Sequence, residues 1–216
     1  MSDGWVESAQ AWIADMERGD FSREFVLDAP MLARVRARSV ERALDVGCGE
    51  GRFCRMLRAL GIATVGIDPT QGLIERAAQL DPGGDYRLGR AEALEFPAQS
   101  FDLVVSYLTL IDIDDAAAAV TEMARVLRPG GSLLIANLAG AITAGDDYFG
   151  EHAQWTQWRG IRVRNWHRPL QRYMELLLAQ QLRLRWFEEP QPSGGDAAIV
   201  ERYRRMPWHY IMEWGR

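Results

Sequence analysis

The sequence predicts an α/β fold: a doubly wound sheet of seven strands, mostly parallel, with helices on both faces and an antiparallel hairpin at its C-terminal edge. Three observations predict it. Short apolar runs alternate with segments of helical periodicity between residues 42 and 138, as in repeated strand–helix–strand units. The run over residues 132–138 is almost continuously apolar, which is typical of a parallel strand covered on both faces. After residue 168, a helical segment precedes two more strand-like runs.

The expected elements follow one another in a regular order. The strands cover residues 42–47, 63–68, 86–91, 101–108, 132–138, 182–190 and 208–214. The helices cover residues 53–60, 71–80 and 114–127, and a further one begins at about Pro169. In the first helix, Phe53, Leu57 and Leu60 share one face. In the third, acidic residues at the start and Arg125 near the end match the helix dipole.

The composition excludes several classes of function. The net charge is −5 and the basic residues are scattered arginines, so the footprint of a nucleic-acid-binding protein is missing. Lysine is absent from the sequence, which excludes Schiff-base chemistry. Because no apolar run could span a membrane and the N-terminus does not resemble a secretory signal, we expect a soluble cytoplasmic protein. The two cysteines, Cys48 and Cys54, form no metal-binding pattern, and we expect no metal.

The stretch LDVGCGEGRF, residues 44–53, ends the first expected strand, at the edge where doubly wound sheets bind ligands. A dinucleotide-binding loop follows GxGxxG, but Arg52 stands at the third glycine position. Asp45 would repel a pyrophosphate and suits a ligand that carries an ammonium group. A phosphate-binding loop ending in GK[ST] is excluded because the chain has no lysine.

Asp68 closes the second expected strand. A carboxylate at this position can accept hydrogen bonds from both hydroxyls of a ribose. An adenosine with a cationic amino-acid tail and no phosphate satisfies all of these constraints. We therefore expect S-adenosyl-L-methionine as the cofactor and S-adenosyl-L-homocysteine as the product.

Four motifs carry a resemblance to a known family: LDVGCGEGRF, GIDPTQGLIERA, GRAEALEFPAQSFDLVVSYLTLIDI and RVLRPGGSLLIAN. In this order and spacing they resemble the core of the class I S-adenosylmethionine-dependent methyltransferases of the small-molecule type. The segment HRPLQRYMELLLAQQLRLRWFEEPQP is similar to the tail of family members. The resemblance implies a Rossmann-like fold and a transferase that uses S-adenosylmethionine.

The resemblance also implies roles for individual residues. The loop glycines Gly47, Gly49 and Gly51 would line the methionine and ribose portion of the cofactor. Asp45 would meet the amino group, and Asp68 would hold the ribose hydroxyls. Ala91 and Glu92 would flank the adenine, with Arg90 standing where family members often carry an acid, and Ser106 and Tyr107 would lie beside the sulfonium. We expect further cofactor contacts from Cys48, Pro69 and Trp12.

A single domain is expected over residues 1–216, because this length suits one core. Its expected parts are a helical cap or lid over 1–40, a cofactor-binding core over 41–138, an irregular aromatic insertion at the substrate site over 139–168, and a C-terminal helix with edge strands over 169–216. The aromatic residues of the cap and the insertion predict walls over the methyl end of the cofactor, with ordinary core packing as the alternative.

Methyl transfer from a sulfonium is an in-line displacement, and much of its acceleration comes from holding the acceptor close and desolvated. A base is more useful for an alcohol or a carbon acid than for a phenol or an amine. His167 follows the aromatic insertion and is a candidate base, with a structural hydrogen bond at the start of the next helix as the alternative. Tyr107 is a candidate for orienting the acceptor. His209 lies within the last expected strand and is interpreted as structural.

The expected function is methylation of a small, hydrophobic or aromatic acceptor, at oxygen first, with nitrogen and carbon as alternatives. A second hypothesis is a protein that binds S-adenosylmethionine as a sensor, or uses its sulfonium for a reaction other than methyl transfer. A nicotinamide oxidoreductase is disfavoured by Arg52 and Asp45. The sequence SYLT replaces the [ND]PP[YF] of many base-modifying methyltransferases, so we expect no nucleic-acid partner. We also expect no membrane association, and a monomer or a homodimer.

Overall fold

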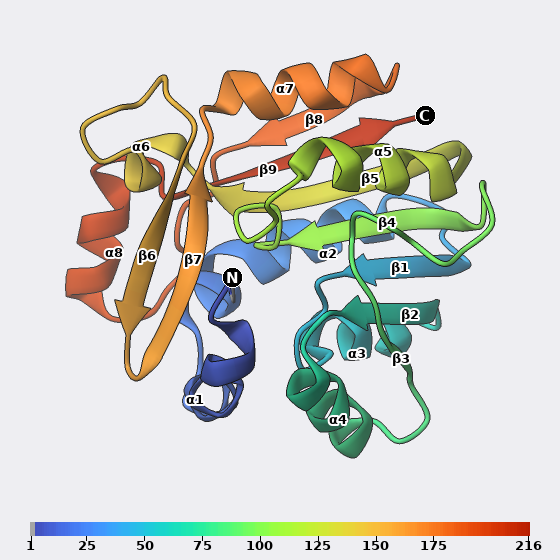
Figure 1. Cartoon of the computed structure of the whole chain (residues 1–216), viewed down its shortest axis with the longest axis horizontal. Coiled ribbons are helices and arrows are strands. Elements are labelled where there is room, and N and C mark those ends of the chain that lie inside the picture. The colour runs from blue at the N-terminus through green and yellow to red at the C-terminus, as the bar shows by residue number, and fades with distance from the viewer. Residues whose placement is uncertain (1–2) are drawn as a thin grey trace.

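A computed structural model describes residues 3–216, which form a seven-stranded sheet in the order β3-β2-β1-β4-β5-β9-β8 (Figure 1). Its strands are β1 (Arg42–Val46), β2 (Ala63–Asp68), β3 (Asp85–Leu88), β4 (Phe101–Tyr107), β5 (Leu127–Leu138), β8 (Arg183–Glu188) and β9 (His209–Gly215). The first five run parallel, and β9 pairs antiparallel with both β5 and β8. This confirms the predicted sheet and its antiparallel edge.

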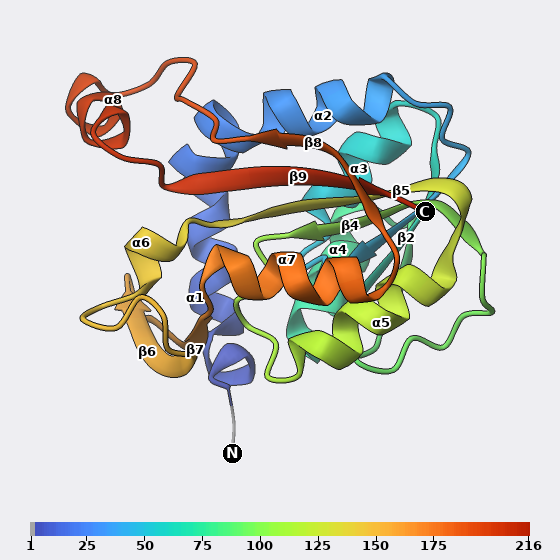
Figure 2. The same cartoon turned by 90° about the horizontal axis from the view of Figure 1, so that it is seen from above.

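Helices cover both faces of the sheet. They are α1 (Trp5–Glu17), the π-helix η1 (Ser22–Leu27), α2 (Asp28–Arg36), α3 (Arg52–Ala59), α4 (Gln71–Leu80), α5 (Ala116–Val126), α6 (Gly140–Thr143), α7 (Leu170–Ala179) and α8 (Ala197–Arg204). Figure 2 shows α2 and α3 on one face and α5 and α7 on the other. Between residues 3 and 216, no helix combines the length and apolarity that a membrane crossing requires.

The central strand β4 shows why most of its residues are apolar. Successive strand residues point to opposite faces. Leu103 and Val105 therefore pack in one buried cluster with Leu57 of α3, and Val104 packs in another with Met123 of α5. Both faces of the strand are buried, which leaves no solvent-facing position for a polar residue.

The insertion over residues 139–168 is not irregular as predicted. It contains α6 and an antiparallel hairpin of β6 (His152–Trp158) and β7 (Ile161–His167). The two turn residues, Arg159 and Gly160, have φ angles of 44° and 84°, as a tight hairpin turn of type I′ requires. The exposed and half-buried residues of β6 alternate, and this period of two was the overlooked pattern.

Three other boundaries differ from the prediction. The loop expected before the last strand contains α8, whose first turn is capped by Asp196 accepting from the Ala198 and Ile199 amides. Strand β5 begins at Leu127, before the RPGG stretch that was expected to separate helix and strand. Strand β3 ends at Leu88, so Ala91 and Glu92 lie in the turn beyond it.

The carboxyl ends of the parallel strands point toward α1, the β6–β7 hairpin and α8, on the left of Figure 1. The first of these, α1, is hydrogen bonded to the hairpin. The Arg162 amide donates to Ser8 Oγ at 3.0 Å, and Ser8 Oγ donates to the Arg162 carbonyl at 3.1 Å. The rings of Trp12 and Trp158 meet edge to face at 6.3 Å. Helix α1 and the hairpin therefore form one cover over this edge of the sheet.

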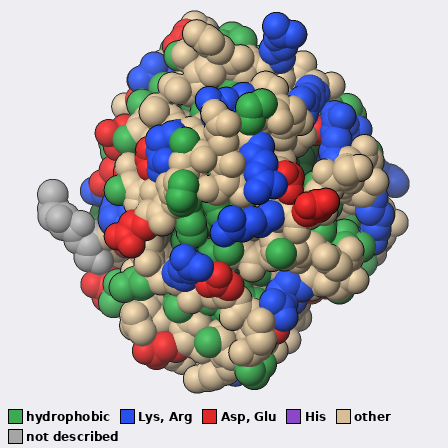
Figure 3. All heavy atoms as spheres, turned by 90° about the vertical axis from the view of Figure 1, so that its right-hand side faces the viewer, with side chains coloured by type: hydrophobic (Ala, Val, Ile, Leu, Met, Phe, Trp, Pro, Cys, Tyr) green, Lys and Arg blue, Asp and Glu red, His purple; other side chains and the backbone are tan. Residues whose placement is uncertain are grey.

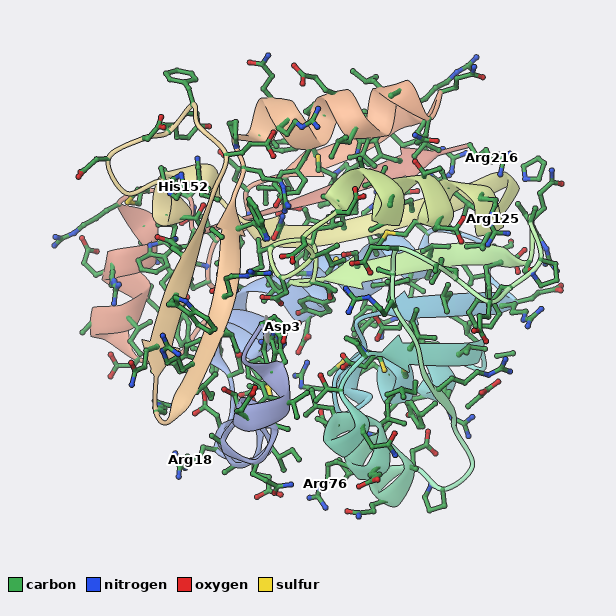
Figure 4. The ribbon with its side chains drawn as sticks, viewed as in Figure 1. Asp3, Arg18, Arg76, Arg125, His152 and Arg216 are labelled. Carbon is green, nitrogen blue, oxygen red and sulfur yellow. The ribbon has the colours of Figure 1, made fainter. Side chains whose placement is uncertain are left out.

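The opposite side of the molecule, toward the amino ends of the parallel strands, faces the viewer in Figure 3. Arginine side chains on this face are interspersed with acidic and apolar ones. Arg125 and Arg216 lie at this end of the sheet in Figure 4, whereas Asp3 lies at the other end, beside α1. No continuous basic surface is visible on the face shown.

Candidate active site

A cavity of about 670 Å³ lies at the carboxyl ends of the strands. The sheet forms its floor, and α1, η1, the β6–β7 hairpin and α8 contribute its other walls. Doubly wound sheets bind ligands at this edge, where neighbouring crossovers diverge. Asp3, labelled in Figure 4, is one of the lining residues.

The glycine turn between β1 and α3 leaves no room for side chains. Gly47 has a φ of 73°, and a Cβ on it would lie 2.1 Å from Thr109 Cγ2. Gly51, with a φ of 77°, precedes α3, and a Cβ on it would lie 2.5 Å from the Tyr86 ring. Gly47 and Gly49 line the cavity, whereas Gly51 does not and shapes the turn from outside. The turn therefore presents bare backbone to a ligand.

Two carboxylates flank this turn, and both line the cavity. Asp68 accepts hydrogen bonds from the amides of Gly49 at 3.0 Å and Thr70 at 2.8 Å, and burial raises its pKa. Asp45 Oδ2 accepts from Cys54 Sγ at 3.4 Å. Its Oδ1 is buried and has no hydrogen-bond partner within residues 3–216. Burial raises the pKa of Asp45 to about 7. An unpartnered buried oxygen of this kind fits a cationic donor from a ligand.

The remaining residues expected around the cofactor are mostly brought together. Four of them line the cavity: Trp12, Cys48, Pro69 and Ala91. Glu92 also lines it and pairs with Arg90 at 2.8 Å. Ser106 does not line it, because its side chain is fully buried in β4 and its Oγ has no partner within residues 3–216.

Tyr107, at the end of β4, lines the cavity with its hydroxyl engaged elsewhere. The hydroxyl donates to Asp28 Oδ1 at 2.9 Å, and Arg52 donates to both oxygens of Asp28 at 2.8 and 2.6 Å. Burial raises the pKa of Tyr107 well above its ordinary value. The phenol therefore stays protonated and is held in place, so it can form a wall but not act as a base.

The structure does not bring His167 to the cavity. The ring is fully buried and does not line the cavity. Its Nδ1 lies 2.8 Å from Thr143 Oγ1, and its Nε2 lies 2.8 Å from the Tyr148 carbonyl oxygen. Both nitrogens are thus used to tie β7 to α6 and the loop after it, and this placement gives no support to a role as the base.

His209, interpreted from the sequence as structural, lies at the cavity. It is the first residue of β9 and pairs with Leu138, the last residue of β5. The side chain lines the cavity, yet neither ring nitrogen has a hydrogen-bond partner in the described part of the chain. Burial lowers its pKa to about 4, so the ring is neutral near pH 7 and has a lone pair available, although the same burial weakens its basicity. The antiparallel direction of β9 could have indicated this placement, since it brings the first residue of that strand to the carboxyl edge.

The glycine turn, with an acid at the end of each of the first two strands, defines a protein that binds an adenosine cofactor at the carboxyl edge of its sheet. Residues 44–135 match the family model of a methyltransferase domain. Over residues 44–135 the chain is therefore similar to the class I S-adenosylmethionine-dependent methyltransferases, whose cofactor is S-adenosylmethionine.

The similar proteins agree with this class. A malonyl-[acyl-carrier protein] O-methyltransferase of Yersinia pestis is 38% identical over 129 residues, which cover 59% of this chain and 46% of that protein. A ubiquinone biosynthesis O-methyltransferase of Parvibaculum lavamentivorans is 36% identical over 121 residues, covering 54% and 47%. The chain thus spans about half the length of the curated relatives it matches. A solved methyltransferase of Mesorhizobium loti has a TM-score of 0.66 at 24% identity, covering 82% of this chain and 91% of that one.

Proposed function

We propose that this protein transfers the methyl group of S-adenosylmethionine to an oxygen atom of a small molecule. One observation carries the proposal: a single cavity extends from the glycine turn and Asp68 to the unpaired His209. A cofactor and an acceptor therefore have room side by side. The O-methyltransferase names of the two relatives support oxygen as the methylated atom.

We propose that the cofactor occupies the part of the cavity near β1, β2 and β3. Asp45 Oδ1 would accept from the ammonium group, because that oxygen is buried and otherwise unpartnered. Asp68 would hold the ribose hydroxyls, and Glu92 would meet the adenine. The remaining contacts would come from Gly47, Cys48, Gly49, Pro69, Ala91 and Trp12, all of which line the cavity.

When bound, the cofactor supplies an electrophilic methyl group on a sulfonium. The acceptor hydroxyl would lie near His209, whose neutral ring would accept the hydroxyl proton, while the cofactor would supply the methyl group. The aromatic cover excludes water and holds the acceptor in line. In this arrangement Tyr107 is a wall held by Asp28, and it exchanges no proton.

We further propose that α1, η1 and the β6–β7 hairpin act as a cap over the core at 41–138, within one domain, whereas α2, also within the expected cap, packs against a face of the sheet. The cytoplasmic location, and a monomeric or homodimeric state, stay predictions from the sequence.

The proposed function is tested by measuring S-adenosylhomocysteine formation by the full chain with a panel of phenols, alcohols and carboxylic acids. Formation that depends on the acceptor supports methyl transfer. Binding of S-adenosylmethionine without product across the panel would favour the alternative of a sensor or a different reaction. Mass spectrometry of the product then identifies the methylated atom.

A further inference from the structure

The two ends of the cavity differ in charge. The end near the glycine turn is lined by six acids, and by two arginines that are already paired within the protein. The acids are Asp3, Asp45, Glu50, Asp68, Glu92 and Asp112; the arginines are Arg52, paired with Asp28, and Arg90, paired with Glu92. The end near β9 and α8 is lined by Arg23, Arg159 and Arg202, together with Asp15 and Asp20. An acidic end suits the cationic cofactor. The arginines at the other end need anionic partners, either within the protein or from a ligand.

Two of the three arginines are already neutralised within the protein. Arg23 pairs with Asp20 at 2.6 Å, and Arg159 pairs with Asp15 at 2.7 Å. Arg202 has no carboxylate partner in the part of the chain that the structure describes. Arg202 is an exposed residue, and its guanidinium lies 4.2 Å from the ring centroid of Trp208, so a cation–π contact holds it beside the cavity without a carboxylate partner.

A stack of rings lies beside this arginine. Tyr203 stacks on Trp208 at 4.8 Å and 17°, and on His209 at 5.9 Å and 22°. The Tyr203 hydroxyl lies 2.7 Å from Ser22 Oγ, which fixes α8 against the start of η1. All three rings line the cavity. This end of the cavity therefore combines flat aromatic surfaces, an unpaired cation and the unpaired His209.

We propose that the acceptor is an aromatic acid: a ring that packs on the Tyr203–Trp208 stack, with a carboxylate paired to Arg202 and a hydroxyl directed to His209. This inference rests on the proposed function and specifies its acceptor. An Arg–carboxylate pair can be bidentate, which fixes orientation as well as adding affinity. The carboxylate serves as the anchor and the hydroxyl oxygen receives the methyl group, so the product is an ether and not an ester.

Binding is tested by calorimetry on the full chain saturated with S-adenosylhomocysteine. The probes are the isomeric hydroxybenzoates and, as uncharged matches, the corresponding hydroxybenzamides. At least one acid should bind about tenfold more tightly than its amide, with a preference that weakens in high salt. In Arg202→Gln that preference should disappear while the amide affinity stays within about twofold. Arg204→Gln is the matched control, since Arg204 is exposed on the same helix and does not line the cavity.

Equal binding of acid and amide, an unchanged preference in Arg202→Gln, or no acid binding below about 1 mM would overturn the inference. Methylation of the carboxylate, seen as an ester by mass spectrometry, would also overturn it. The proposal of methyl transfer and the proposal of an aromatic acid as acceptor can be contradicted independently, because the binding experiment involves no turnover. Acid binding through Arg202 without any S-adenosylhomocysteine formed from S-adenosylmethionine would remove methyl transfer alone, whereas turnover of neutral acceptors without an acid preference would remove the aromatic acid alone.

Discussion

At the scale of single residues, the carboxyl group of Asp45 combines two costs. It is buried, and one of its oxygens lacks a partner within residues 3–216. Leaving such an oxygen unpaired costs free energy in the empty protein. In the proposed arrangement the ammonium group of the cofactor would recover that cost, because it would donate the hydrogen bond that this oxygen lacks.

The ionisation of Asp45 makes cofactor binding depend on pH. Burial raises its pKa to about 7 from an ordinary value of 3.8, and an ammonium group prefers the ionised form. Affinity for S-adenosylhomocysteine, measured by calorimetry, should therefore rise as the pH increases through 7. Asp45→Asn should bind more weakly at pH 8 and lose most of this rise, and an equal rise in the variant would contradict the assignment.

The stability of the protein without cofactor should fall as the pH rises, whereas cofactor affinity should increase. Between pH values of about 4 and 7, the folded chain holds the Asp45 proton while the unfolded chain releases it. The free energy of unfolding then falls as the pH rises through this window. Asp45→Asn removes this contribution, which denaturant titrations at several pH values would show as a shallower slope.

The two buried histidines should separate activity from stability. His209→Gln should lower kcat by about tenfold or more, because it removes the proposed proton acceptor, with S-adenosylhomocysteine affinity unchanged. His167→Gln disturbs two buried hydrogen bonds and should lower stability by about 1–3 kcal/mol while retaining most of kcat. Steady-state kinetics and thermal melts of both variants check this; a larger loss of kcat in the His167 variant would reverse the assignment.

At the scale of elements, the sequence predicts those helices, strands and turns that are set by a pattern of neighbouring residues. The parallel strands, the glycine turn and Asp68 follow from apolar runs and from the position of each strand end. The β6–β7 hairpin and α8 were missed because the signals were short: a two-residue turn at Arg159 and Gly160, and a single capping residue, Asp196. A short strand or helix repeats its pattern of buried and exposed residues only a few times. Its presence is therefore indicated mainly by a single turn or capping residue.

The hairpin turn gives a prediction at this scale. Gly160→Ala places a side chain at a φ of 84° without a steric clash, because the nearest atom to its Cβ is 3.7 Å away. The cost is conformational, and stability should fall by about 1 kcal/mol. Gly72→Ala in α4 is the control, since its Cβ would meet Ala9 at an ordinary 3.6 Å and should leave stability equal or higher. Equal melts of the two variants would contradict the assigned turn.

At the scale of the whole molecule, the cavity is assembled from segments far apart in the sequence. The cofactor half comes mainly from consecutive strand ends, and therefore most of its lining could be predicted. The other half joins η1, the end of β5, α8 and the start of β9. Arg202 and His209 reach this cavity through the fold. The antiparallel direction of β9 could have indicated where His209 lies, but the residues around Arg202 gave no sign of its proposed role.

Filling the cavity should stabilise its cover. Saturation with S-adenosylhomocysteine should slow amide hydrogen exchange in α1 and the β6–β7 hairpin, since both line the cavity and the ligand would pack beneath them. Helix α7, which contributes no lining residue, is the internal control. Mass spectrometry of exchanged peptides would show the difference, and protection spread equally over α7 would argue against a local cover.

The contact between Tyr107 and Asp28 has a practical consequence for altering which acceptors the enzyme takes. Asp28 joins the wall at Tyr107 to Arg52, directly after the glycine turn. Replacing Tyr107 to enlarge the cavity would remove its hydrogen bond to Asp28. Because Asp28 also binds Arg52, the substitution would disturb the glycine turn as well. Leu138 and Ile142 also line the cavity, and neither takes part in the hydrogen bonds of Asp28. Substitutions at these two positions should therefore change the range of acceptors without disturbing the glycine turn.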